Sequence, residues 1–169
     1  IISPYEPVAI LVLLFYLLLG INMTALNRQV DGTHYKKYQY QPTQFFMDTD
    51  LSYPIASAIK YLSRIGVEKD KNNIGIDKAV HYVELFQEYY QDKDCFNVIT
   101  SEKLKEYTKE FTQQFPEPVS EIITDLVHLS TGLDWCYYDH HICTYPLIDP
   151  VLLEQGCKSV ISNLNTIKE

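Results

Sequence analysis

The sequence predicts a mainly α-helical protein: a small helical domain with an irregular N-terminal segment and an acidic helical extension. Three observations support this fold class. Apolar residues recur at intervals of three and four, which is the spacing of one face of an α-helix. Several of these stripes begin after a capping residue or a proline and end at a glycine. No segment alternates apolar and polar residues for long enough to predict a β-strand.

Composition divides the chain into three parts. Residues 1–22 are apolar, residues 23–92 carry nearly balanced charge, and residues 93–169 hold most of the acidic excess behind the net charge of −8. The length of 169 residues suits one domain with a small appendage. An acidic surface repels a phosphate backbone, so binding of duplex nucleic acid is not expected. A small nucleotide in a local basic pocket remains compatible with this charge.

The apolar run over residues 8–21 contains no charged residue. It is short for a membrane helix, which needs about 20 apolar residues. The chain begins with Ile1, and Met23 follows the run. Three interpretations stay open. In the first, Met23 is the native start and residues 1–22 are upstream sequence. In the second, residues 8–21 anchor the protein in a membrane. In the third, residues 8–21 form a buried or oligomer-forming helix, and a homo-oligomer is then one expected assembly.

Residues 24–50 are expected to be irregular, because Asp31-Gly32 favours a turn and Gln41-Pro42 favours an extended break. A first helix is predicted over residues 52–65, with Ser52 as its cap and Pro54 in its first turn. Its apolar stripe consists of Ile55, Ala58, Ile59, Leu62 and Ile65. Gly66 is expected to end this helix.

Four further helices are predicted after a polar loop. The second covers residues 76–90, and weaker helices cover residues 101–114 and 119–131, the latter closed by Gly132. The last helix begins at Pro150, which follows Asp149 as a cap. These helices place the apolar residues inward and leave mixed charge on the opposite faces.

Lys60 and Arg64 lie four residues apart on the first predicted helix, opposite its apolar stripe and beside Tyr61. Such a pair suits two oxygens of a phosphate, because a guanidinium forms bidentate contacts and an ammonium adds a point charge. The alternative is an ordinary solvated helix face.

A second set of polar residues follows at helical spacing. Asp77 and His81 lie four residues apart, and Lys78 and Tyr82 form the next such pair. A histidine one turn from an aspartate can be oriented for proton transfer, although an exposed surface pair has the same spacing. His34 lies in the irregular segment, where binding residues tend to concentrate. We expect His34, Lys60, Arg64 and Asp77 to converge on one cleft.

These motifs together resemble the SaV-like domain of tailed bacteriophages. The resemblance covers about residues 31–92 and is carried by His34-Tyr35, Gln41-Pro42, the Ile-Lys-Tyr-Leu-x-Arg-x-Gly pattern of residues 59–66, and the Asp-x-Ala-x-x-Tyr pattern of residues 77–82. The same domain is found in a coliphage nucleotide kinase. The resemblance therefore implies a phage protein that binds nucleotides, with phosphoryl transfer as its activity. Such a protein is expected in the host cytoplasm. If residues 8–21 form an anchor, it is expected at a membrane instead.

The resemblance also assigns roles to residues of this chain. Catalytic roles are expected for His34 and Asp77 from the resemblance, and for His81 from its spacing of four residues to Asp77. Ligand binding is expected for Tyr35, Lys60, Tyr61, Arg64, Lys69, Lys78 and Tyr82. The partner would be a mononucleotide, and a nucleoside triphosphate would donate the phosphoryl group; no other cofactor is indicated. The alternative function is a non-enzymatic phage accessory protein that binds a host or phage protein through its acidic helices.

Two other chemistries receive less support. No Gly-x-x-x-x-Gly-Lys-Ser/Thr motif occurs in the sequence, so a P-loop kinase is excluded and side chains or helix N-termini must hold any phosphate. Cys136, His140 and Cys143 offer ligand types that zinc prefers, but the surrounding aromatic residues favour a buried turn, and no metal site is predicted. The four cysteines are expected to be reduced thiols.

Overall fold

A computed structural model describes residues 35–65, 73–90, 102–131 and 150–168 of the chain. These residues form α2 (Pro42–Thr49), α3 (Tyr53–Leu62), α4 (Ile74–Tyr90), α5 (Glu102–Thr112), α6 (Val119–Thr131) and α7 (Pro150–Thr166). No strand occurs in this part of the chain. The mainly α-helical fold class is therefore confirmed.

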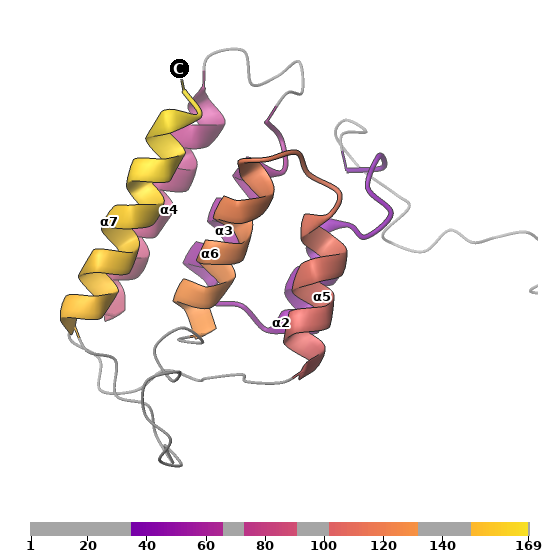
Figure 1. Cartoon of the computed structure of the whole chain (residues 1–169), viewed down its shortest axis with the longest axis horizontal. Helices are drawn as coiled ribbons and strands as arrows, with labels where there is room; N and C mark the ends of the chain where they lie inside the picture. The colour runs from indigo at the N-terminus through magenta and orange to yellow at the C-terminus, as the bar shows by residue number, and fades with distance from the viewer. Residues whose placement is uncertain (1–34, 66–72, 91–101, 132–149, 169) are drawn as a thin grey trace, which may run out of the picture.

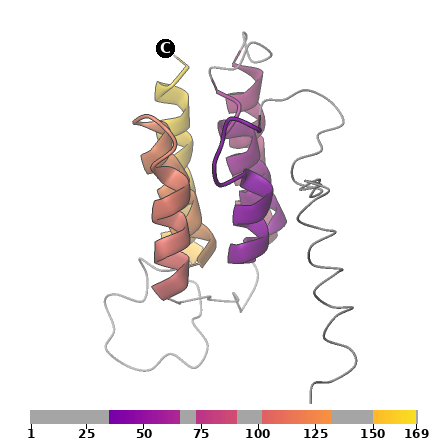
Figure 2. The same ribbon diagram turned by 90° about the vertical axis from the view of Figure 1, so that its right-hand side faces the viewer.

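The helices form two layers of three (Figures 1 and 2). The first layer contains α2, α3 and α4, and the second contains α5, α6 and α7. Each helix of the first layer packs on a helix of the second layer: α2 on α5, α3 on α6 and α4 on α7. In each pair the start of the first helix lies beside the end of its partner, as shown by contacts of Tyr40 with Gln114, Ser52 with Ser130, and Asn73 with Lys168. The pairs are therefore antiparallel.

One hydrophobic core fills the space between the layers. Every one of the six helices contributes fully buried side chains to it, including Phe45, Ile59, Phe86, Phe111, Ile123 and Leu153. The stripe predicted for the first helix is confirmed at Ile55, Ala58, Ile59 and Leu62, which are all buried. Its last member, Ile65, lies beyond the helix and is only partly buried. The acidic C-terminal helices thus share their core with the helices of residues 35–90.

Helix α2 corrects the prediction that residues 24–50 are irregular. Gln41 has the extended backbone expected before a proline, but Pro42 begins a helix rather than interrupting the chain. The backbone N–H of Gln41 donates to Oε1 of Gln44 (3.2 Å), which closes the first turn. The sequence pattern missed this helix because it is only eight residues long and its core contact rests mainly on Phe45.

The other helices lie close to their predicted ranges. Helix α3 ends at Leu62 rather than at residue 65, because Arg64 and Ile65 donate their backbone N–H groups to the third residue before them, which tightens the chain into a turn. Ser52 occupies the N-cap position of α3, but its side chain forms no cap hydrogen bond. Its hydroxyl instead lies 3.4 Å from that of Ser130 on α6.

Several predicted features lie outside the described residues. These are the apolar run of residues 8–21, His34, Lys69, the expected helix signals at Gly66, Gly132 and Asp149, and the Cys136, His140 and Cys143 segment. Among the helices that the structure does describe, none combines the length and the apolar character that crossing a membrane requires.

Gln114 links the two layers at the start of α2. Its Oε1 accepts the N–H of Tyr40 (3.0 Å), and its Nε2 donates to the carbonyl of Tyr40 (3.1 Å). We expect Gln114→Ala to lower the free energy of unfolding by about 1–3 kcal/mol, because both backbone groups of Tyr40 lose a partly buried partner. Urea denaturation measures this change. Gln113→Ala, an exposed neighbour, should change it by less than about 0.5 kcal/mol, and equal losses in the two variants would contradict the prediction.

Candidate functional site

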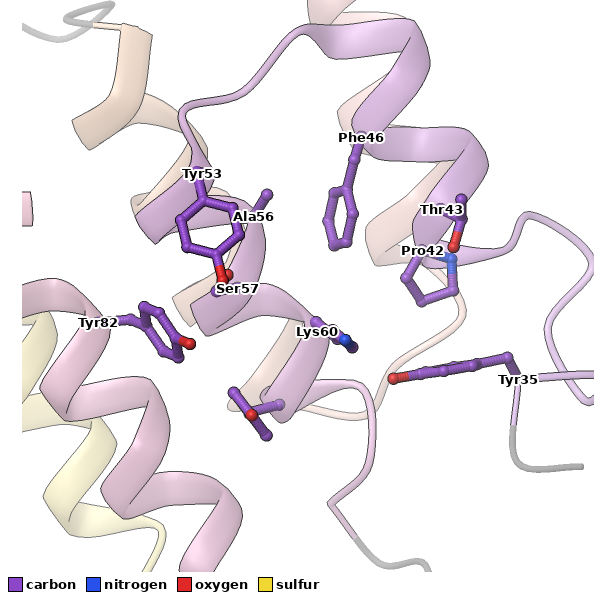
Figure 3. A pocket seen from close by; sticks show the side chains of 10 residues that line it. Tyr35, Pro42, Thr43, Phe46, Tyr53, Ala56, Ser57, Lys60 and Tyr82 are labelled. Carbon is purple, nitrogen blue, oxygen red and sulfur yellow. The ribbon is translucent and has the colours of Figure 1, made fainter. Parts of the chain in front are cut away.

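A pocket of about 310 Å³ lies on the first layer of helices, and no residue of α5, α6 or α7 lines it. Pro42, Thr43 and Phe46 of α2 form one side, and Tyr82 of α4 lies on the other (Figure 3). Helix α3 supplies Tyr53, Ala56, Ser57, Lys60 and Tyr61, and Tyr35 closes the end nearest the start of the described chain. We call this cavity the tyrosine pocket, because four of its ten lining residues are tyrosines.

Tyr61 joins the aromatic and the cationic parts of the tyrosine pocket. Its ring stacks on that of Tyr82, with centroids 5.8 Å apart and an interplanar angle of 20°. Two cations approach the same ring: Cζ of Arg64 lies 5.7 Å from its centroid and Nζ of Lys78 lies 5.0 Å from it. Both distances fall within the range of cation–π attraction. Lys60 lines the pocket directly from the same helix.

Arg64 is held at the pocket by Tyr35. Its Nε–H donates to the hydroxyl oxygen of Tyr35 (2.7 Å), and its Cζ lies 5.2 Å from the centre of the Tyr35 ring. Burial raises the pKa of Tyr35 above its ordinary value of 10.0, so the phenol stays neutral at physiological pH. The hydrogen bond engages Nε, whereas the terminal nitrogens of the guanidinium point to no described partner. They are the donors that an anion would use.

Lys60, Arg64 and Lys78 form no ion pair with any carboxylate of the described residues. Two described carboxylates of α4 have other partners: Asp77 pairs with Lys168, and Glu84 lies 4.0 Å from His81. Two cations at the ring of Tyr61 and a third that lines the same pocket repel each other unless an anion offsets them. The arrangement therefore favours a negatively charged ligand.

The opposite end of the pocket carries hydroxyl groups. Tyr53 and Tyr82 meet edge to face with centroids 6.1 Å apart, and Ser57 lies beneath them (Figure 3). The pKa of Tyr53 is lowered, chiefly by the neighbouring hydroxyls of Tyr82 and Ser57 and also by the charge of Lys60. The neighbouring hydroxyl of Tyr53 raises the pKa of Tyr82.

Most of the residues that the sequence predicted to bind a ligand lie at this pocket. Tyr35, Lys60, Tyr61 and Tyr82 line it. Arg64 and Lys78 reach its edge through their contacts with Tyr61. The prediction omitted Tyr53, Ser57 and Phe46. Tyr53 and Ser57 share a helix face with Lys60 and Arg64, at spacings of four, three and four residues, and this polar stripe is the signal that could have identified them.

The residues expected to act in catalysis lie elsewhere or outside the described chain. Asp77 is directed to helix α7, where it forms an ion pair with Lys168, and it does not line the pocket. His81 is exposed and lies beside Glu84 on the surface of α4. The i, i+4 spacing correctly indicated that Asp77 and His81 share a helix, but it could not show which neighbour the helix face meets.

Comparison of the chain with models of known protein families, with curated proteins and with solved structures found no match. Within the described ranges, no group of three or more His, Cys, Asp or Glu side chains is arranged to hold a metal ion. The class of ligand therefore has to be inferred from the tyrosine pocket itself, which combines three cations, stacked aromatic rings and a cluster of hydroxyls.

Proposed function

We propose that this protein binds a mononucleotide in the tyrosine pocket. The phosphate would lie at the end formed by Lys60, Arg64 and Lys78, and the base would lie toward Tyr53 and Tyr82. The observation that carries the proposal is the approach of two cations, Arg64 and Lys78, to the ring of Tyr61 that stacks on Tyr82, with Lys60 lining the same pocket. None of the three cations has a carboxylate partner among the described residues.

The cationic end suits a phosphate for a specific geometric reason. Tyr35 engages Nε of Arg64 and leaves the two terminal nitrogens for a forked contact with phosphate oxygens. Lys60 lies one turn before Arg64 on α3, and Lys78 approaches from α4. Charge-assisted hydrogen bonds of this kind contribute about 1.5–3 kcal/mol each.

The aromatic part suits a planar ring. Stacking of a nucleobase on an aromatic side chain contributes about 1–3 kcal/mol per base, and Tyr53, Phe46 and Tyr82 offer rings on different sides of the pocket (Figure 3). A volume of about 310 Å³ is at the small end of the usual range for ligand pockets, which is roughly 300–1,000 Å³. One mononucleotide is therefore a better match than a dinucleotide or a large cofactor.

The resemblance to the SaV-like domain of tailed bacteriophages supports the same ligand class and extends the proposal to a phage nucleotide kinase. The pocket geometry supports the binding part more directly than the catalytic part, because Asp77 pairs with Lys168 and His81 with Glu84. Phosphoryl transfer relies mainly on positioning and charge neutralisation, which Lys60 and Arg64 would supply. A nucleoside triphosphate would be the donor.

Isothermal titration calorimetry with nucleoside monophosphates tests the proposal. We expect binding in the micromolar to millimolar range and a rise in melting temperature, because a ligand that binds only the folded state stabilises it. The matching nucleosides, which lack the phosphate, should bind at least about tenfold more weakly. Absence of binding by any monophosphate at millimolar concentration would refute the proposal. Incubation with a nucleoside triphosphate and analysis of the products measures kinase activity separately.

The role of Tyr35 in holding Arg64 gives a further prediction. We expect Tyr35→Phe to weaken mononucleotide binding about two- to tenfold, because the ring remains but the hydroxyl that accepts the Nε–H of Arg64 is lost. Titration calorimetry measures the effect. Tyr89→Phe removes the same atom from an exposed ring that does not line the pocket, and it should leave the affinity unchanged. Equal affinities for wild type and Tyr35→Phe would count against this role.

A further inference from the structure

The tyrosine pocket has two chemically different ends, and the second end has no counterpart in the motifs predicted from the sequence. The end at Tyr35 and Arg64 is cationic. At the other end, Tyr53, Ser57 and Tyr82 form a cluster of three hydroxyls (Figure 3), which we call the hydroxyl triad. Lys60 lies between the two ends on helix α3, and Tyr61 lines the pocket from the same helix.

We propose that the hydroxyl triad determines which nucleobase the tyrosine pocket accepts. This inference rests on the proposed binding of mononucleotides and adds the residues that set the selectivity of the same site. The triad is built from two helices: Tyr53 and Ser57 lie one turn apart on α3, and Tyr82 reaches across from α4. A change in any of the three residues would alter the pattern of hydrogen-bonding groups at this end.

The other parts of the pocket offer little discrimination between bases. Every nucleotide carries the same phosphate, so the cationic end cannot distinguish one nucleotide from another. Stacking on Tyr61, Tyr82 and Phe46 is also tolerant, because every base has an aromatic face. The hydroxyl of Tyr35 accepts from Arg64 and belongs to the cationic end. Selectivity therefore has to come from polar groups near the base, and the triad concentrates three of them.

The triad is arranged to favour one hydrogen-bonding pattern over another. Tyr53 and Tyr82 meet edge to face with centroids 6.1 Å apart, and the hydroxyl of Ser57 acts to lower the pKa of both tyrosines. This proximity matters because a hydroxyl has one donor hydrogen, and a hydrogen that is used inside the cluster cannot serve the ligand. Ser57 is only 8% exposed, so a base that leaves it without a suitable partner loses a hydrogen bond that water does not easily replace.

Tyr53 differs from the other two members in its exposure. It is 75% exposed and lies at the rim of the pocket, whereas Ser57 lies at the base. A bound base at this end would cover the Tyr53 ring and remove apolar surface from water. The rim position also means that Tyr53→Phe leaves the core intact, which makes it the cleanest single substitution for a test.

The experiment compares the affinities of the adenine, guanine, cytosine and uracil nucleoside monophosphates, with ribose 5-phosphate as a probe that lacks the base. Wild type and the variants Tyr53→Phe, Ser57→Ala, Tyr82→Phe and the triple combination are titrated by calorimetry. We expect wild type to separate its best and worst base by about tenfold or more, which corresponds to one or two hydrogen bonds. In the triple variant this ratio should fall to about threefold or less, while the affinity for ribose 5-phosphate changes less than about twofold.

Tyr35→Phe is the matched control, because it removes a tyrosine hydroxyl from the opposite end of the same pocket. It should weaken all four nucleotides and ribose 5-phosphate by a similar factor and leave the ratio between bases unchanged. Melting temperatures identify any variant that is unfolded, and in that case Tyr53→Phe alone, at its exposed position, decides the outcome.

The outcomes separate the two proposals. Wild type that binds all four monophosphates equally, or a triple variant that keeps the wild-type ratio, overturns the role of the hydroxyl triad and leaves nucleotide binding in place. An equal loss of affinity for the nucleotides and for ribose 5-phosphate in the triple variant also overturns it, because the triad would then support the phosphate end. Wild type that binds no mononucleotide refutes the proposed function itself and this inference with it.

Discussion

Replacing Arg64 with alanine is expected to weaken mononucleotide binding by about ten- to a hundredfold while the protein remains folded. The substitution removes a guanidinium whose Nε–H is bonded to Tyr35 and whose terminal nitrogens are available to a phosphate. Arg64 follows the C-terminus of α3 and lies outside the buried stripe of that helix. The free energy of unfolding should therefore fall by no more than about 0.5–1.5 kcal/mol, the value of the hydrogen bond to Tyr35.

Titration calorimetry and thermal melting of the same samples test both parts of this expectation. Arg64→Lys keeps the charge but loses the forked geometry, so its affinity should lie between those of wild type and Arg64→Ala. Lys158→Ala, an equal change of charge at an exposed position on α7, should leave binding unchanged. A variant that binds normally but melts far below wild type would identify Arg64 as a structural residue instead.

Combining Arg64→Ala with Tyr35→Phe shows whether the two side chains act together. Because Tyr35 is expected to work through Arg64, the double variant should bind nearly as well as Arg64→Ala alone. Strictly additive losses in the double variant would show that Tyr35 contacts the ligand independently of Arg64.

Replacing Phe45 with alanine is expected to lower the free energy of unfolding by about 3–5 kcal/mol. Its side chain is completely buried, and its ring stacks on that of Phe111 from α5 with centroids 4.2 Å apart and an interplanar angle of 2°. Tyr40 meets both rings edge to face. The substitution would leave a cavity between α2 and α5, where the aromatic cluster holds the two layers together.

Urea denaturation of Phe45→Ala and of Met47→Ala provides the comparison. Met47 lies on the same helix but is 78% exposed, so its loss should change the free energy of unfolding by less than about 0.5 kcal/mol. Phe45→Ala should also weaken mononucleotide binding, because α2 carries Pro42, Thr43 and Phe46 into the pocket. Similar stabilities of the two variants would contradict the role of Phe45 as the anchor of α2.

Helix α2 was not predicted from the sequence because its formation depends on packing, above all on the packing of Phe45. A helix of eight residues presents too few apolar positions for a recognisable period. Short helices are also unstable alone, so packing decides whether they form. Here the decisive contacts come from Phe111 and Gln114, which lie more than sixty residues away in the chain. Such long-range contacts cannot be seen in a local pattern.

The candidate site was partly predictable for a related reason. Lys60, Tyr61 and Arg64 lie within five residues at the end of α3 and in the turn that follows it, so their spacing indicates that they share a region of surface. Their meeting with Tyr35 and Tyr82 depends on how the preceding segment and α4 pack against α3. The orientation of Asp77 toward Lys168 depends in turn on the packing of α4 against α7.

Local sequence patterns were sufficient to predict the helical class, the approximate ranges of α3 to α7, most of the buried stripe of α3 and the cations beside it. These properties follow from local backbone preferences and from the 3.6-residue period of the α-helix. Contacts between distant parts of the chain were needed to show that α2 is a helix, that Asp77 pairs with Lys168 just after α7, and that Tyr53, Ser57 and Tyr82 meet at one end of a pocket. A periodic pattern fixes which side chains share a helix face, but the neighbour that each face meets is selected by the packing of the whole core.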